Sequence, residues 1–238
     1  MEFTIISGYF GCGRNSKKYF KIHGLYQAKK NELKPFNKEY YIIPAEKSAD
    51  FVCQMEKVLE VYERPYNPDF PVVCLDESPK QIIDYQVFTG TDGTTYQDSE
   101  YPRLGVAELF VAFEPLAGHR VMTVEKDHKT EAWVHFIANQ MDTTYKNATK
   151  VTWVMDNLST HKDANFYKWF TPEVAKAYLE RLQIVYTPKH GSWLNMAEIQ
   201  FSIITRQVFD RPFKSKDEVQ AVVKKWVEDQ NKRKVGAK

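Results

Sequence analysis

The sequence has 238 residues, 43% hydrophobic and 27% charged, and this ordinary globular composition argues against both a disordered chain and a disulfide scaffold. Its 33 Lys and Arg residues nearly balance 31 Asp and Glu residues, so the formal net charge is +2 and any basic surface for nucleic acid must be local. At about 150 residues per domain, the length predicts one large domain, or one domain with a small appendage.

The cysteines and the first residues of the chain indicate the cellular compartment. Cys12, Cys53 and Cys74 lie far apart with no CxxC pair, which argues against a zinc knuckle and a disulfide framework. Glu2 stands where a signal peptide carries positive charge, and no apolar run approaches the ~18 residues of a membrane span. We therefore expect a soluble protein of a reducing cytosol.

The first regular element is expected after an irregular start. Residues 1–45 contain several glycines and a lysine-rich stretch, and we expect them to contribute little to a core. From Ser48 to Tyr62, apolar residues recur at i, i+4, i+7, i+8 and i+11, the spacing of one helical face. The pattern predicts an irregular segment over 1–45 and a folded domain over 46–238.

The middle of the chain reads as strands. Three prolines in residues 63–71 end the first helix, and residues 71–78 (PVVCLDES) follow as a buried strand with a polar end. After a polar stretch, further strands are predicted at 106–115 and 119–126. The short link 116–118 between them indicates an antiparallel hairpin.

The second half alternates between helix and strand. Helices are predicted at 130–145, at about 163–182 with a break near Pro172, from Ser192 onward, and at 216–231; strands are predicted at 151–157 and 183–188. Hairpin strands followed by this alternation predict an α/β fold, a mixed sheet with helices packed on it.

Three acidic residues stand out against this background. Asp76 and Asp156 each follow an apolar strand, where mixed and parallel sheets open their binding crevice. Glu198 lies in the segment expected to be helical from Ser192, in a polar stripe with Asn195, Ser202 and Thr205. Carboxylates without cysteine favour Mg²⁺ or Mn²⁺ over zinc, and two such ions serve in-line displacement at phosphorus.

Each acid taken alone has an ordinary explanation. An Asp after a strand is commonly a turn former or a helix cap, and a single Glu on a helix is usually solvated. The inference therefore depends on the three occurring together in this topology, because a polar stripe within an apolar helix has no evident packing reason.

Four longer sequence motifs resemble those of a known protein family. They resemble the DDE transposases of bacterial insertion sequences, in the mariner superfamily, and the likeness runs from about Lys30 to Asn231. The motifs are PVVCLDESPKQI (71–82), LFVAFEPLAGHR (109–120), VMDNLSTH (154–161) and YTPKHGSWLNMAEIQFS (186–202).

The resemblance implies a ribonuclease H-like fold, a mixed five-stranded sheet with helices on both faces. It implies that Asp76, Asp156 and Glu198 are the catalytic triad and hold two Mg²⁺ or Mn²⁺ ions. Such enzymes hydrolyse the phosphodiester at transposon ends and then use the freed 3′-hydroxyl to attack target DNA, typically at a TA step. The partners implied are double-stranded DNA and further copies of the chain, in a bacterial cytoplasm at the nucleoid.

The family pattern also supplies supporting or DNA-contacting residues. Asn157 and His161 follow the second acid, where they could point at a phosphate oxygen, while a buried or capping His remains equally open. Lys189 and His190, in the turn before the third acid, could contact the DNA backbone or simply face solvent. Asn195 completes the set.

The sequence departs from the family at its ends. The first 28 residues show no helix-turn-helix pair, and the family continues beyond the last predicted helix. We therefore expect a catalytic domain truncated at both ends, with impaired activity and no end specificity. The alternative is an inactive transposase remnant that only binds DNA or self-associates.

The sequence supports a nucleotide-binding function less well than a transposase function. The segment GYFGCGRN (8–15) has the spacing of a phosphate-binding loop, but Arg14 and Asn15 replace its Lys and hydroxyl residues.

Overall fold

A computed structural model describes two compact units, Met1–Gln54 and Met55–Lys238, which we treat separately. The candidate phosphate-binding loop lies, from residue 9 onward, outside the described part of the chain. The residues described are 4–8, 19–23, 41–42, 48–84, 87–89, 91, 93–97, 100–234 and 236.

The first unit contains a small antiparallel sheet where the sequence analysis expected no regular structure. Its strands are β1 (Thr4–Gly8), β2 (Tyr19–His23) and β3 (Tyr41–Ile42). The segments TIISG and YFKIH carry β-branched and aromatic residues that favour strands, a signal that the surrounding glycines and lysines concealed. Helix α1 (Ser48–Tyr62) begins in this unit, has the bounds predicted from its periodicity and ends in the second unit.

The second unit is built on a mixed five-stranded sheet in the order β10-β9-β4-β7-β8. Strand β9 runs parallel to both of its neighbours, whereas β7 runs antiparallel to both of its own. The strands are β4 (Val72–Ile83), β7 (Arg103–Glu114), β8 (His119–Glu125), β9 (Val151–Met155) and β10 (Leu182–Tyr186). The α/β fold with a mixed five-stranded sheet is confirmed.

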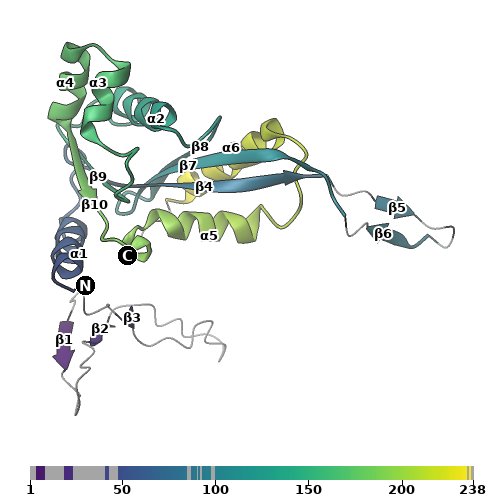
Figure 1. Cartoon of the computed structure of the whole chain (residues 1–238), viewed down its shortest axis with the longest axis horizontal. Helices are drawn as coiled ribbons and strands as arrows, with labels where there is room; N and C mark the ends of the chain where they lie inside the picture. The colour runs from purple at the N-terminus through teal and green to yellow at the C-terminus, as the bar shows by residue number, and fades with distance from the viewer. Residues whose placement is uncertain are drawn as a thin grey trace. The chain divides into compact units, whose positions relative to one another are not determined.

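The predicted hairpin between β7 and β8 is present. The backbone N–H of Gly118 donates to the Glu114 carbonyl at 3.0 Å, and Gly118 has a φ of 64°, which favours glycine. A second short hairpin, β5 (Val87–Thr89) with β6 (Thr95–Gln97), lies in the chain between β4 and β7 (Figure 1).

One face of the large sheet is covered by helices from the middle of the chain (Figure 1). Trp133 and Ile137 of α2 pack there with Leu75 of β4 and Trp153 of β9 in one buried cluster. The break expected near Pro172 is also found, because Pro172 opens a new helix. The helical elements are α2 (Thr130–Asp142), a 3₁₀ turn (Asp163–Asn165), α3 (Phe166–Trp169) and α4 (Pro172–Arg181).

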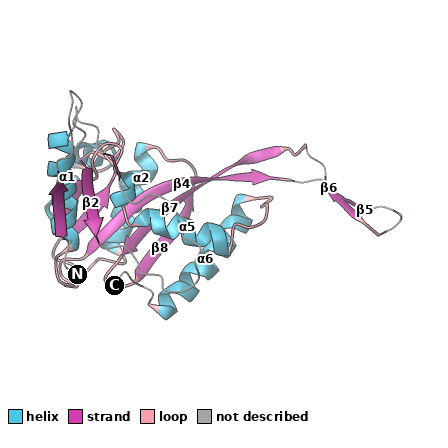
Figure 2. Cartoon of the chain, turned by 90° about the horizontal axis from the view of Figure 1, so that it is seen from below, coloured by secondary structure: helices cyan, strands magenta, loops and turns pink. Residues whose placement is uncertain are grey.

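The other face carries α5 (Ala197–Gln207) and α6 (Lys216–Arg233), as Figure 2 shows. Helix α5 contacts β4 and β7, and α6 contacts mainly β8, so helices cover both faces. None of the helices among the described residues has the length and apolar character needed to cross a bilayer.

Helix α5 begins later than the sequence predicted. The helix was expected from Ser192, but Ser192–Leu194 forms a 3₁₀ turn and the helix begins at Ala197. The Asn195 side chain accepts a hydrogen bond from the Ala197 backbone N–H at 3.1 Å and thereby satisfies one of the N–H groups left open at the start of a helix. Asn195 therefore precedes the helix, and its place in a helical polar stripe was wrong.

Candidate active site

Asp76 lies where strand β4 loses one of its neighbours. Strand β9 pairs with β4 only from Val72 to Cys74, whereas β7 pairs with β4 along almost its whole length, with Asp76 opposite Val111. Asp76 was expected at the end of a strand, but β4 continues to Ile83 because of this pairing with β7. The end of β9, rather than the end of β4, opens the sheet beside Asp76.

Consecutive residues of β4 face opposite sides of the sheet. Leu75 belongs to the cluster with α2, while the Cys74 thiol lies 3.3 Å from the Tyr62 hydroxyl of α1. By this alternation Asp76 shares the side of Cys74, and Glu77 shares the side of Leu75. Two adjacent acids therefore act on different faces.

The Asp76 carboxyl group is crowded by burial and by other acids. Burial raises its pKa first, the charge of Glu198 follows, and the charges of Glu77 and Asp156 add to them, so that the pKa reaches about 7. The Glu77 backbone N–H, which donates to Asp76 Oδ1 at 2.9 Å, opposes the rise. Several acidic side chains around one half-buried carboxylate are typical of a site that binds a cation.

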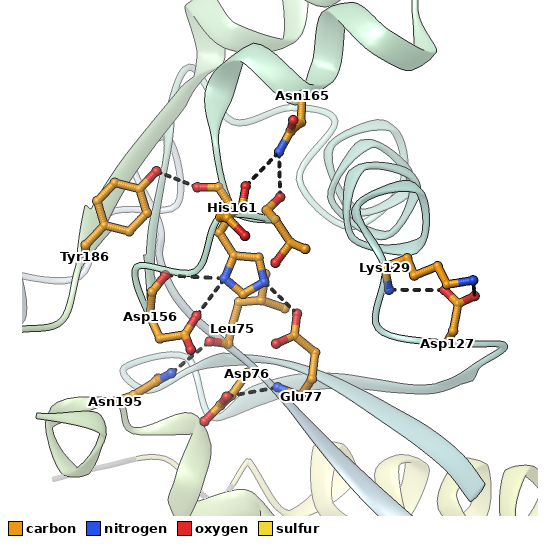
Figure 3. A network of polar contacts seen from close by, with 12 residues as sticks. Leu75, Asp76, Glu77, Asp127, Lys129, Asp156, His161, Asn165, Tyr186 and Asn195 are labelled. Atoms are coloured by element: carbon orange, nitrogen blue, oxygen red, sulfur yellow. Dashed lines mark hydrogen bonds and ion pairs between the residues drawn. The ribbon is translucent and has the colours of Figure 1, made fainter. Parts of the chain in front are cut away.

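Asp156 follows β9 directly and is held by His161 (Figure 3). Its Oδ1 lies 2.7 Å from His161 Nδ1, and His161 Nε2 lies 3.1 Å from Glu77 Oε1. Burial of the ring lowers its pKa, but the hydrogen bonds and charges of the two carboxylates outweigh burial and raise the pKa of His161 to about 9. The imidazole ring thus lies between two carboxylates, which favour its protonated form.

Glu198 stands in the first turn of α5, and Asn195 fixes where that helix begins. The Asn195 side chain is buried, with 2% of the residue exposed, and its Nδ2 donates to the Leu75 carbonyl at 2.8 Å. The Tyr62 hydroxyl donates to the Leu194 carbonyl at 2.9 Å and ties the same turn to α1. The start of α5 is therefore attached to β4 one residue before Asp76.

Three further predicted residues, Asn157, Lys189 and His190, are exposed. Asn157 is exposed and accepts a hydrogen bond from Lys162 Nζ at 2.5 Å. Lys189 and His190 are exposed in the turn after β10, where His190 has a φ of 65°. His161 differs from them, because its residue is only 2% exposed and both ring nitrogens face carboxylates.

The acids are near one another without forming a closed ligand shell. Within the described residues, no group of three His, Cys, Asp or Glu side chains is close enough to hold a metal ion as it stands. The Asp156 side chain is 37% exposed and Glu198 is exposed, so two of the three carboxylates border solvent.

Sequence reasoning missed Glu77. It stands beside Asp76 in the motif CLDES, and alternation along the strand could have placed it on the other face. Its partner His161 lies 84 residues away, however, and only the pairing of β4 with β9 brings the two together.

The fold is similar to that of solved transposase structures. A Mos1 mariner paired-end complex with Mn has a TM-score of 0.54 and 13% identity, with 82% of this chain and 60% of that chain covered. A Mos1 transposase paired-end complex with the left transposon end has a TM-score of 0.56 and 12% identity, with 88% and 63% covered. This chain thus spans about three-fifths of their length, and the likeness establishes the ribonuclease H-like fold.

The family is established by the sequence. A search of the curated proteins gives no match. Residues 71–220, more than half of the chain, match the DDE superfamily endonuclease family, and they include Asp76, Asp156 and Glu198. The chain belongs to the DDE superfamily of endonucleases.

Proposed function

We propose that this chain is the catalytic domain of a transposase, which cleaves DNA strands and joins them to a target with the help of two Mg²⁺ or Mn²⁺ ions. The observation that carries the proposal is the crowding of acids at Asp76. Glu198 from α5 and Asp156 from the end of β9 both raise its pKa, although these residues are far apart in the sequence.

The residues fit hard divalent cations. Three carboxylates supply oxygen ligands, and the buried thiol of Cys74 has its pKa raised to about 12, first by burial, so it does not compete as a thiolate. Asp76 is half-buried, whereas Asp156 and Glu198 border solvent, so a cation can reach the acids.

Asp76, Asp156 and Glu198 would hold the ions, and bound ions would supply activation of an attacking water or 3′-hydroxyl and stabilisation of the leaving oxygen. The chain itself fixes the ligands from two sides. Asn195 sets the start of α5 against β4, and His161 holds one oxygen of Asp156. Lys189, His190 and Asn157 are exposed, and we propose that they contact the DNA backbone.

The substrate and the assembly follow from the family resemblance. We propose double-stranded DNA with transposon ends as the substrate, a TA-containing target, and a homo-oligomer during transposition. The similar Mos1 structures are paired-end complexes, which supports this choice. An origin in a bacterial insertion sequence of the mariner superfamily is part of the same proposal.

A plasmid-nicking assay tests the proposal. Supercoiled DNA incubated with the protein and Mn²⁺ or Mg²⁺ should be converted to the nicked form, and Asp156→Asn should abolish conversion because it removes a ligand charge. The control is Asp163→Asn, which removes an exposed carboxylate from the same loop. Nicking without metal, or nicking that survives Asp156→Asn, would contradict the proposal; no nicking at all would favour the inactive remnant.

A further inference from the structure

We infer that Glu77, acting through His161, is a positioning residue that holds the Asp156 carboxylate ready for metal binding. The inference rests on the proposed function and extends it to a residue on the opposite face of the sheet from Asp76. It is carried by a continuous chain of contacts from β4 through the imidazole to the loop after β9 (Figure 3).

The imidazole ring lies between the two carboxylates. His161 Nε2 lies 3.1 Å from Glu77 Oε1, and Nδ1 lies 2.7 Å from Asp156 Oδ1. Nδ1 also lies 3.3 Å from the Asp156 carbonyl oxygen, so this ring nitrogen contacts both the backbone and the side chain of Asp156. The contact of Nε2 with Glu77 therefore fixes the ring orientation in which Nδ1 faces Asp156.

The imidazole is also fixed in position by its surroundings. It stacks on the Trp133 ring with centroids 5.2 Å apart and an interplanar angle of 23°. The His161 carbonyl accepts from the Tyr186 hydroxyl at 2.5 Å, and Asn165 Nδ2 donates to the Thr160 carbonyl at 2.8 Å. The ring therefore has little freedom to turn, and it transmits the position of Glu77 to Asp156.

The proposed ligand Asp76 and the positioning residue Glu77 lie on opposite faces of the sheet. Asp76 faces the side of α5, whereas Glu77 points to the side of α2, where its side chain is 11% exposed. Asp156 has one oxygen against the ring, and its side chain remains 37% exposed. Glu77 is thus placed to orient a ligand without becoming one, as carboxylates do behind metal-binding residues.

The test is Mn²⁺ binding by Glu77→Gln, which keeps the side-chain shape and removes the charge. Titration of the full chain without DNA, followed by electron paramagnetic resonance of free Mn²⁺, should show binding weakened about 10- to 100-fold relative to the unsubstituted chain. Nicking should be lost at low Mn²⁺ and recover as Mn²⁺ is raised. Combining Glu77→Gln with His161→Gln should weaken binding no further than His161→Gln alone, because both act through one contact.

The matched control is Glu108→Gln. Glu108 belongs to another Glu–His pair, 3.4 Å from His128 Nδ1, and its side chain is 12% exposed. If Glu77→Gln lowers only the melting temperature and leaves Mn²⁺ affinity unchanged, or if Glu108→Gln weakens Mn²⁺ equally, the positioning role is overturned. If the unsubstituted chain binds no Mn²⁺, the proposed function fails, and this inference with it.

Discussion

Asp76 and Glu114 are two carboxylic acids of the same sheet with the same raised pKa and different surroundings. Each has a pKa of about 7, against usual values of 3.8 and 4.5. At Asp76 burial is joined by the charges of three other acids, whereas at Glu114 burial acts alone. The comparison teaches that a raised pKa by itself reports burial, and that only the surrounding acids indicate a cation site.

The surroundings of Glu114 are mainly apolar and aromatic, with Asn67 as a polar neighbour. It is 6% exposed and lines a small pocket with Tyr66, Phe70 and Leu116, beside the residues that lead into β4. No described residue forms an ion pair with its carboxylate. Glu114 therefore serves as an internal reference for a buried acid without acidic neighbours.

Activity should separate the two acids most strongly. We expect Asp76→Asn to lower the nicking rate by roughly 10³-fold or more, equivalent to about 4 kcal/mol, while Glu114→Gln stays within about twofold. The physical reason is that only Asp76 shares its site with Glu198 and Asp156. Single-turnover nicking with Mn²⁺ measures both variants, and equal losses would remove the distinction between them.

Burial of Glu114 should also make the stability of the protein depend on pH. The folded-state pKa of Glu114, about 7, lies above its usual 4.5, so the folded state binds more protons and stability falls as pH rises from about 4.5 through about 7. Its contribution is present at low pH and lost above pH 7, up to about 3 kcal/mol. Urea unfolding of the metal-free protein at pH 5 and pH 8 should show this slope reduced in Glu114→Gln.

Urea unfolding of Glu114→Gln in the presence of Mn²⁺ provides a control. Because Glu114 is separate from the proposed ligands, Mn²⁺ should stabilise Glu114→Gln as much as the unsubstituted chain, by about 2.7 kcal/mol at one hundred times the Kd. If the unfolding free energy of Glu114→Gln depends on pH as strongly as that of the unsubstituted chain, the pH dependence does not come from the buried Glu114 carboxyl group.

Asn195→Ala should give the smallest of the expected effects. It removes the hydrogen bonds to the Leu75 carbonyl and from the Ala197 N–H, at a cost of about 1–3 kcal/mol in unfolding free energy. Because α5 then loses its attachment beside Asp76, Mn²⁺ affinity should fall as well. Urea unfolding and Mn²⁺ titration measure the two effects; unchanged Mn²⁺ affinity would make Asn195 a purely structural residue.

Much of the sheet and its helices could be predicted from local patterns. The period of apolar residues placed α1 from Ser48 to Tyr62, and the apolar strand motifs located β8 and β9 closely. Boundaries set by non-local contacts were predicted less well. Strand β4 runs beyond Asp76 because β7 pairs with it, and α5 starts late because Asn195 bonds across to β4.

The sequence by itself determined which residue types are present to bind hard cations, and the motifs around Asp76, Asp156 and Glu198 determined the family. Tertiary structure alone decided that His161 lies buried between Glu77 and Asp156. The reason is physical: periodicity reports which face of an element is apolar, whereas the partner of a polar side chain depends on which distant strands become neighbours.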